Sequence, residues 1–291
     1  MRFFRGARSR FLVSCCNIDG KVFVLEQRGT SVSSRQVLDG ASTGIAVSPR
    51  SRRVFAGHPN GVHVLDDRFR ALPAEDYDCE GGDVHDVKCD GDALLVVETS
   101  HNRVTSYTKP GAPAWSWAVS AGEGDRAHVN SLLKRDGDWL TSMFSPEGLG
   151  EPWRDRLDGA IMQIPVNHSQ GGAILRRGLL HPHSLNDVDG ALWFCESRLR
   201  RVMRVGFAGD AAPEVVAELP AYTRGLAITP DWILVGQSRS DAHFVRPLLE
   251  ENKPLKDAGM CGVWFVSRHS DERFFIELPA LEVYDIVELP D

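Results

Sequence analysis

The stretch HSLNDVDGALWFCESRLRRVMRVG, from His183 to Gly206, decides the fold. It contains a short strand, a polar Asp-Gly turn, a hydrophobic strand, a second turn and a third strand. This is the pattern of antiparallel strands joined by tight turns. A fourth strand follows over Glu214–Leu219. The stretch therefore predicts one small antiparallel sheet of four strands.

The same pattern recurs along the chain. HDVKCDGDALLVVETSHNRVTSYT begins at His85, TGIAVSPRSRRVFAGHPNGVHVLD begins at Thr43, and shorter copies begin at His128 and Arg224. With His183, these starts are 42, 43, 55 and 41 residues apart, close to the period of roughly 40–50 residues in propeller blades. Helical periodicity is scarce. The repeats therefore predict an all-β chain folded as a β-propeller.

The two ends of the chain complete the predicted ring. The first forty residues supply only three strands, over Phe11–Cys15, Lys21–Glu26 and Ser34–Leu38. The missing inner strand is available in Glu282–Leu289, with the sequence EVYDIVEL. We therefore expect six blades in a single domain over residues 1–291, with the first blade closed by the C-terminal strand.

Composition excludes several classes of partner. The net charge is −7 and no long basic run is present, which argues against nucleic acid and anionic membranes, because both require clustered Lys and Arg. The chain shows neither a signal peptide nor a spanning segment, so we expect a cytoplasmic protein. The six cysteines include no Cys-x-x-Cys pair and are expected to be reduced structural thiols. The oligomeric state is left open.

Polar residues recur where the predicted inner strands begin. In a propeller, equivalent positions of the inner strands form a ring around one mouth of the central channel. The ring predicted in this way is Thr43, His85, His128, His183, Arg224 and Tyr284. Alternation along a strand places the residue two positions after a ring member on the same side, so Asn130, two positions after His128, is also expected to face the channel.

Three of these residues are histidines in consecutive blades. Neutral imidazole is a ligand for divalent transition metals, and three protein ligands leave one position open for water or substrate. We therefore predict that His85, His128 and His183 hold a divalent metal ion such as Zn, Fe, Cu or Mn. The alternative is that each histidine is a solvated or hydrogen-bonded strand residue. We read the other seven histidines mainly as surface residues.

Further side chains are expected around this mouth. Glu98, Glu196 and Gln237 end the second strands and are candidates to orient the ligand histidines or to contact substrate, together with Asn130 and Thr43. Capping of turns in solvent is the alternative for the carboxylates. Two insertions, over 145–158 and 239–260, join second to third strands and should project from the same mouth.

The segment PHSLNDVDGALWFCESRLRRVMRVG, over 182–206, resembles the blade repeat of streptogramin lyase and of gluconolactonase-like propellers. Over most of the chain, the order His-Asp-Val, His-Val-Asn, Pro-His-Ser and Thr-Arg-Gly-Leu-Ala resembles an uncharacterised family of bacterial propeller proteins. The constellation is also similar to the lyase half of peptide-amidating enzymes. That resemblance implies zinc on His85, His128 and His183, with Arg224 and Tyr284 as catalytic helpers.

These observations favour a metal-dependent enzyme of the lyase or hydrolase type. Its substrate would be a small polar, anionic metabolite or modified amino acid. Arg224 would bind a substrate carboxylate or phosphate through its bidentate fork, or would instead form a structural salt bridge. Tyr284 would act as general acid or base if its pKa were lowered. The second reading is a non-catalytic propeller that binds a ligand or a protein.

Overall fold

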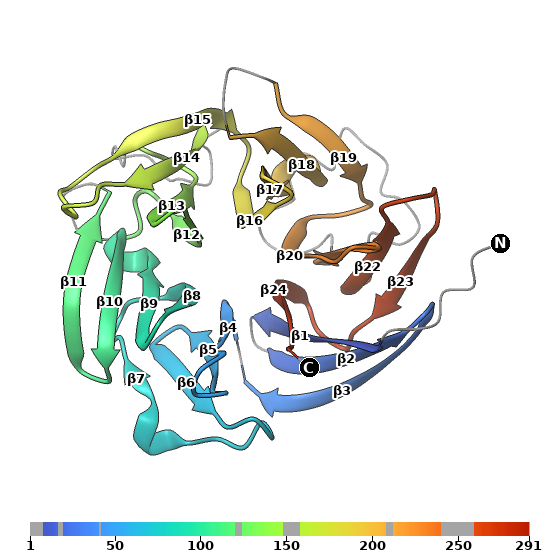
Figure 1. The fold of residues 1–291 in the computed structure, drawn as a ribbon, viewed down its shortest axis with the longest axis horizontal. Helices are drawn as coiled ribbons and strands as arrows, with labels where there is room; N and C mark the ends of the chain where they lie inside the picture. Colours follow the sequence, from blue (N-terminus) through green and yellow to red (C-terminus); the bar gives the residue numbers. More distant parts are fainter. Residues whose placement is uncertain are drawn as a thin grey trace.

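The computed structural model describes residues 8–16, 20–40, 42–119, 124–147, 158–207, 212–239 and 259–290. Their strands form six sheets of four strands each, which stand around a central axis as the blades of a propeller (Figure 1). The described residues contain no α-helix, only short 3-10 turns. The predicted six-bladed all-β propeller is confirmed.

The first blade combines the two ends of the described chain. Its inner strand β24 pairs with β1, with Phe11 opposite Glu288 and Cys16 opposite Glu282. This confirms the predicted closure, and Figure 1 shows β24 beside β1 at the centre of the ring. The sheet order is β24 (Glu282–Glu288), β1 (Arg8–Cys16), β2 (Lys21–Arg28) and β3 (Ser31–Asp39).

The other five blades each use consecutive strands, so every connection within a blade is a hairpin. The second blade is β4 (Ile45–Val47), β5 (Val54–His58), β6 (Gly61–Leu65) and β7 (Tyr77–Asp78); the third is β8 (Val84–Asp90), β9 (Ala93–Glu98), β10 (Arg103–Lys109) and β11 (Ala112–Ala118). The fourth is β12 (Val129–Arg135), β13 (Asp138–Met143), β14 (Gly159–Ile164) and β15 (Ala173–Leu179). The fifth is β16 (Pro182–Val188), β17 (Ala191–Glu196), β18 (Arg201–Gly206) and β19 (Glu214–Glu218); the sixth is β20 (Thr223–Ile228), β21 (Trp232–Gln237), β22 (Gly262–Ser267) and β23 (Arg273–Glu277).

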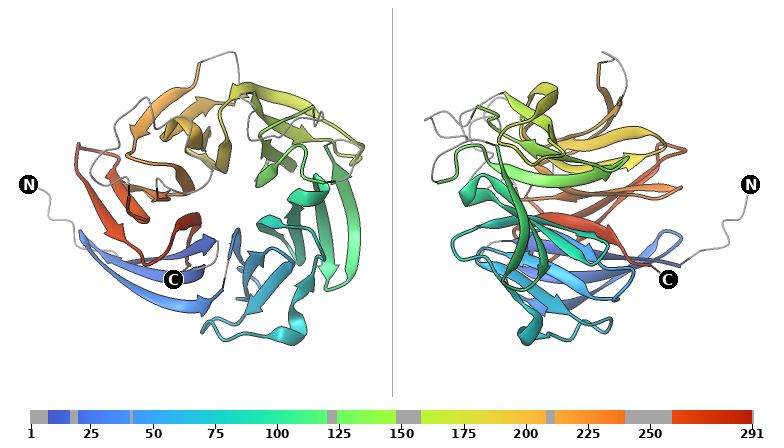
Figure 2. Two further views of the ribbon diagram at one scale, coloured as in Figure 1. Left: turned by 180° about the vertical axis from the view of Figure 1, so that it is seen from behind. Right: turned by 60° about the vertical axis from the view of Figure 1, so that its left-hand side comes forward.

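The hydrophobic core lies between neighbouring sheets. At the closing junction, Phe11 and Val283 of the first blade pack with Leu234, Val263 and Phe265 of the sixth. The six cysteines are free thiols, and all but the half-buried Cys89 are buried, as predicted. Because the faces of the sheets are covered by their neighbours, the inner strands alone line the channel. Figure 2 shows this arrangement from behind and from the side.

The inner strands begin irregularly. Their pairing with the second strand shifts register between Val84 and Asp86, between Val129 and Ser131, between His183 and Asn186, and between Arg224 and Leu226. Each shift is a β-bulge, which adds a residue to one strand only. Counted from the ends of the second strands, Ile45, Val87, Leu132 and Leu226 occupy equivalent positions, so the predicted column is in register except in the fourth blade, where Asn130 and not His128 is equivalent to His85. His128 in particular precedes β12 and has a left-handed backbone, with φ of 51°.

No helix in the described part of the chain is long and apolar enough to cross a membrane.

Candidate functional site

Five of the six residues predicted for the ring lie together at the starts of the inner strands. The imidazole centroid of His85 is 4.8 Å from that of His128 and 5.5 Å from the ring centroid of Tyr284. The guanidinium carbon of Arg224 lies 5.0 Å from the Tyr284 centroid. These side chains and His183 are all buried. The residues that the sequence predicts as a ring of equivalent positions thus form a packed cluster in the structure.

Three residues that the sequence analysis did not select complete the cluster. The Phe144 ring lies 4.4 Å from His128, 5.0 Å from His183 and stacks 4.1 Å from His181. Tyr222 contacts His181, His183 and Arg224. The interpretation of His181 as a surface residue is wrong, because only 2% of it is exposed. The sequence signal for this burial is its position two residues before His183, because alternate residues along a strand face the same side.

The predicted metal ligands each use one ring nitrogen in a hydrogen bond, as metal-binding histidines commonly do. However, Phe144 packs against both His128 and His183. In the described part of the chain, no group of three or more His, Cys, Asp or Glu side chains is arranged to hold a metal ion. These residues do not fit a three-histidine centre, and the divalent ion stays a prediction.

The hydrogen bonds of His183 determine which ring nitrogen carries its proton. Nδ1 lies 3.0 Å from the carbonyl oxygen of His181 and 2.7 Å from Oγ of Ser197. Because a carbonyl can only accept, Nδ1 carries the proton and Nε2 keeps its lone pair. Nε2 is buried and has no hydrogen-bond partner among the described residues. Burial, reinforced by Arg224, holds the pKa of His183 well below its usual value, so the ring is neutral near pH 7.

His85 has the same arrangement with its nitrogens exchanged. Nε2 lies 3.3 Å from a carboxylate oxygen of Asp83, which can only accept when ionised, so Nε2 carries the proton. Nδ1 is buried and has no partner within the described ranges. His128 differs, because its Nδ1 lies 2.6 Å from Asp125 Oδ2. Two buried imidazole nitrogens of the cluster, Nε2 of His183 and Nδ1 of His85, therefore have no described hydrogen-bond partner.

Tyr284 does not have the lowered pKa that its predicted catalytic role requires, whereas Arg224 forms the structural salt bridge given as its alternative. Burial raises the pKa of Tyr284 well above its usual value, although Arg224 opposes the shift. The phenol is therefore protonated, and its oxygen has no hydrogen-bond partner in the described part of the structure. Arg224 forms a buried ion pair with Glu282, with Nη1 3.3 Å from Oε2. Its charge is compensated within the protein.

The remaining predicted residues bind neighbouring protein groups. The Thr43 hydroxyl donates to the carbonyl of Val84 at 2.5 Å, and Asn130 donates to the carbonyl of His128 at 3.2 Å. The Gln237 amide donates to the carbonyl of Met260 at 3.0 Å and accepts from the Trp264 indole at 2.9 Å. These contacts fix the strands around the cluster.

Glu98 and Glu196 do not contact the histidines they were predicted to orient. Both carboxylates are buried at the end of a second strand and bind an arginine at the start of the third. Glu98 accepts from Arg103, and Glu196 accepts from Arg201 at 2.8 Å. Glu196 also accepts from the backbone N–H of Leu180 at 2.9 Å. They stabilise equivalent turns of the third and fifth blades.

A cavity of about 420 Å³ occupies the channel; we call it the channel pocket. His85, His183 and Tyr284 line it where the inner strands begin, and Lys134 and Glu288 line it where they end. The first three side chains are buried, whereas the last two are exposed. The channel pocket therefore opens where the inner strands end. That is the mouth opposite to the one predicted from sequence.

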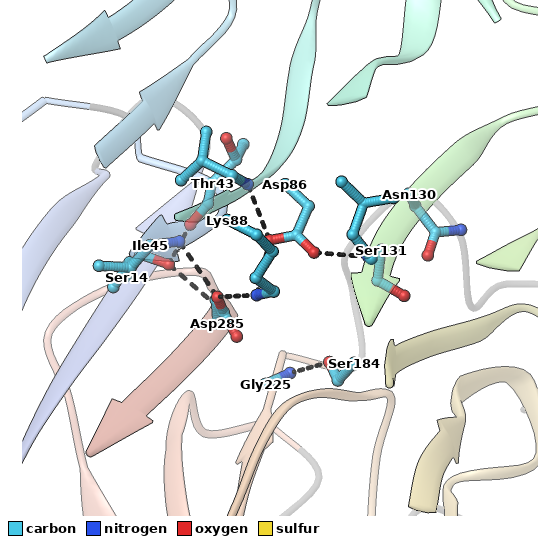
Figure 3. Close-up of polar contacts among 12 residues, drawn as sticks. Ser14, Thr43, Ile45, Asp86, Lys88, Asn130, Ser131, Ser184, Gly225 and Asp285 are labelled. Atoms are coloured by element: carbon cyan, nitrogen blue, oxygen red, sulfur yellow. Dashed lines mark hydrogen bonds and ion pairs between the residues drawn. The ribbon is translucent and has the colours of Figure 1, made fainter. Parts of the chain in front are cut away.

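An ion cluster lies on the wall of the channel pocket. Nζ of Lys88 is 2.9 Å from Asp86 Oδ1 and 3.9 Å from Asp285 Oδ2 (Figure 3). Both carboxylates also accept backbone N–H groups, Asp86 from Leu132 and Asp285 from Ile45. Burial, partly offset by Lys88, raises the pKa of Asp86 to about 6. Lys88 did not emerge from the sequence, because nothing in its local pattern marks it as channel-facing.

The two long insertions lie mostly outside the described residues, over 148–157 and 240–258. Their predicted place beside the pocket is therefore a prediction still.

Solved structures with similar folds belong to proteins of different kinds. A chain of a nidogen–laminin complex has a TM-score of 0.66 at 10% identity, covering 96% of this chain and 98% of that chain. A gluconolactonase from Xanthomonas campestris has a TM-score of 0.56 at 15% identity, covering 82% and 77%. A streptogramin B lyase has a TM-score of 0.50 at 15% identity, covering 82% and 83%. At these identities the likeness shows the fold alone.

Among curated proteins, no sequence matches this chain significantly. One family model does match, over residues 59–291. The resemblance to an uncharacterised propeller family is thereby confirmed. The chain belongs to the family described as "Domain of unknown function (DUF4915)".

Proposed function

We propose that the protein is an enzyme of the lyase or hydrolase type that acts on a small polar metabolite in the channel pocket. The observation that carries the proposal is Nε2 of His183. This nitrogen is buried, keeps its lone pair and has no partner among the described residues, and its residue lines a cavity of about 420 Å³. Buried polar atoms without partners are rare and costly, and a ligand in the pocket would satisfy this one.

The surrounding residues support general acid–base chemistry. A neutral imidazole whose Nδ1–H is held by a carbonyl and a hydroxyl is oriented to accept a proton at Nε2. His183 would take a proton from the bound metabolite, or from water that attacks it, provided that a negatively charged group of the metabolite beside the ring raises its lowered pKa in the complex. Tyr284, protonated and lining the same pocket, would donate a hydrogen bond or a proton to the oxygen or nitrogen on which negative charge develops.

The metal-dependent form of this enzyme remains a separate prediction, and no step above uses a metal ion. Metal content of protein purified without a histidine tag tests it. The anion-binding role of Arg224 is likewise a prediction, to be weighed against its ion pair with Glu282.

Untargeted metabolite profiling tests the proposed enzyme. Wild-type protein, His183→Gln and His58→Gln are each incubated with a bacterial metabolite extract and analysed by mass spectrometry. We expect at least one metabolite to be consumed by wild type and by His58→Gln, whose half-buried side chain lies outside the channel pocket. His183→Gln should consume it at least about a hundredfold more slowly.

Equal consumption by all three proteins would contradict the role of His183. A metabolite that is retained but never converted would favour the non-catalytic binding propeller. Melting temperatures of the variants show whether any loss reflects unfolding.

A further inference from the structure

The ring of His183 is held by two acceptors that are themselves joined by the backbone. Its Nδ1–H is shared between the carbonyl oxygen of His181, at 3.0 Å, and the hydroxyl of Ser197, at 2.7 Å. The backbone N–H of Ser197 donates to the same carbonyl oxygen at 3.2 Å. Ser197 is completely buried, so no bulk water competes for its hydroxyl. A tilt of the imidazole would therefore break a buried contact with a group that the backbone fixes in place.

The hydroxyl of Ser197 accepts from His183, because Nδ1 carries the proton. Its own proton can then go to another group, and Tyr222 is within its reach. Burial raises the pKa of Tyr222 to about 12, and a hydrogen bond from Ser197 is among the contacts that oppose this rise. A hydrogen bond that favours an ionised phenol is one donated to its oxygen. The Tyr222 oxygen in turn lies 3.1 Å from Nδ1 of His181, so polar contacts run from His183 back to His181.

The third blade has the same turn but uses its hydroxyl differently. Thr99 and Ser197 each begin a 3-10 turn directly after a second strand. The backbone N–H of Thr99 donates to the carbonyl of Asp83 at 3.2 Å, as that of Ser197 does to the equivalent carbonyl of the fifth blade. The Thr99 hydroxyl, however, donates to the carbonyl of Val129 in the next blade at 2.6 Å. The turn alone therefore does not direct a hydroxyl to an imidazole.

We propose that Ser197 is a positioning residue for His183, whose hydroxyl holds the ring and stabilises the imidazolium that forms when Nε2 takes a proton. The Nδ1–H of a charged ring is a stronger donor, so its hydrogen bond to Ser197 gains strength in that step, and no proton leaves Nδ1. The inference rests on the proposed function, because it assigns Ser197 a role in that reaction. Glu196, a candidate from sequence to orient a histidine, binds Arg201 instead.

Nuclear magnetic resonance of the Nδ1 proton tests the contact without any turnover. The protein carries ¹⁵N-labelled histidine, and the signal of His183 is identified by its loss in His183→Gln. We expect an Nδ1–H resonance at low field, because a short hydrogen bond to a buried acceptor deshields the proton. Ser197→Ala should move it upfield, since only the carbonyl at 3.0 Å remains. Thr99→Ala, which also removes a completely buried hydroxyl, should leave it unchanged.

Consumption of a metabolite from the bacterial extract tests the role in the reaction. We expect Ser197→Ala to consume the metabolite that depends on His183 about tenfold more slowly than wild type, since it loses a hydrogen bond to a charged group. Ser197→Thr should restore most of the rate, because it keeps the hydroxyl and a threonine occupies the equivalent turn of the third blade. Thr99→Ala should consume the metabolite at the wild-type rate.

Several outcomes overturn the inference without removing the enzyme. A proton of His183 on Nε2 in the wild-type protein would do so, whether or not Ser197→Ala folds. So would an Nδ1–H resonance that does not move in Ser197→Ala, or consumption by that variant at the wild-type rate. Absence of consumption by wild type would overturn the proposed function and the catalytic part of this inference, and the resonance would then decide the orientation of the ring alone.

Discussion

Gly225 has a backbone conformation that only glycine adopts easily, with φ of +68°. A Cβ atom there would lie 2.9 Å from Cγ1 of Ile286 and 3.0 Å from the carbonyl carbon of Asp285, on the inner strand of the next blade. We expect Gly225→Ala to lower the free energy of unfolding by about 2–4 kcal/mol, from backbone strain plus the clash. Chemical denaturation measures it.

Gly190 is the matched control, because its φ is +71° but nothing lies within 4 Å of an added Cβ. Gly190→Ala should cost only the backbone strain, about 1 kcal/mol. Equal losses in the two variants would show that β20 and β24 do not approach as closely as described.

The burial of His181 predicts how the free energy of unfolding depends on pH. Burial, reinforced by nearby positive charge, lowers its folded-state pKa to about 3, whereas the unfolded chain binds the proton near pH 6.5. Below pH 6.5 the unfolded chain therefore binds a proton that the folded protein does not. The free energy of unfolding is unaffected above pH 6.5 and falls by up to about 1.4 kcal/mol per pH unit as the pH falls towards 3. His181→Gln should show a shallower loss of unfolding free energy between pH 7.5 and 4.5. An unchanged slope would contradict the buried neutral state.

At the scale of the strand, three side chains join inner strands of neighbouring blades. Asp285 of β24 accepts from the Ile45 N–H of β4 at 3.1 Å, Asp86 of β8 accepts from Leu132 of β12 at 2.7 Å, and Ser184 of β16 accepts from Gly225 of β20 at 2.9 Å. These contacts occur at every second junction of the ring, and Figure 3 shows them around the channel. They satisfy backbone donors that no strand pairing reaches.

Substitutions of Asp285 distinguish its role as a hydrogen-bond acceptor from the effect of its negative charge. Asp285→Ala leaves the buried N–H groups of Ile45 and Ile286 without their acceptor and should cost about 2–4 kcal/mol of unfolding free energy. The two N–H groups use different oxygens of Asp285, and Asp285→Asn keeps only one of them as an acceptor, so its cost should be about half as large. Denaturation of both variants at pH 7 tests this. An Asn variant as unstable as the Ala variant would assign the role to the charge.

The strands were predictable from sequence because their signals are local. Alternation, β-branched residues and Asp-Gly turns such as Asp189-Gly190 mark them directly, and the repeat period gave the number of blades. The candidate site was predictable only in part. His85, His183 and Tyr284 were selected, but the bulges that orient them add one residue without any composition signal. Phe144 and Lys88 were missed because their roles depend on neighbouring blades.

At the scale of the molecule, stability depends on the pairing of β24 with β1. Deleting residues 282–291 removes the inner strand of the first blade, and with it Val283 and Ile286 from the core shared with the sixth blade. We expect the truncated protein to lose its cooperative thermal transition, because an open edge and an exposed core remain. Calorimetry measures this.

A circular permutant is the control. Joining the two termini by a flexible linker and opening the chain at the Gly190 turn keeps every strand, so this permutant should retain a cooperative transition. Cooperative unfolding of the truncated protein near the wild-type melting temperature would show that the closure is dispensable.

The same closure sets the order of events during synthesis. Cys16 and Glu282, which face each other across β1 and β24, are 266 residues apart. At translation rates of roughly 5–20 residues per second, β1 waits about 13–53 s on the ribosome before β24 exists. During that interval β1 is an unpaired edge beside an unfilled core, which is the kind of surface that nascent-chain chaperones bind. The first blade to leave the ribosome is thus the last to be completed.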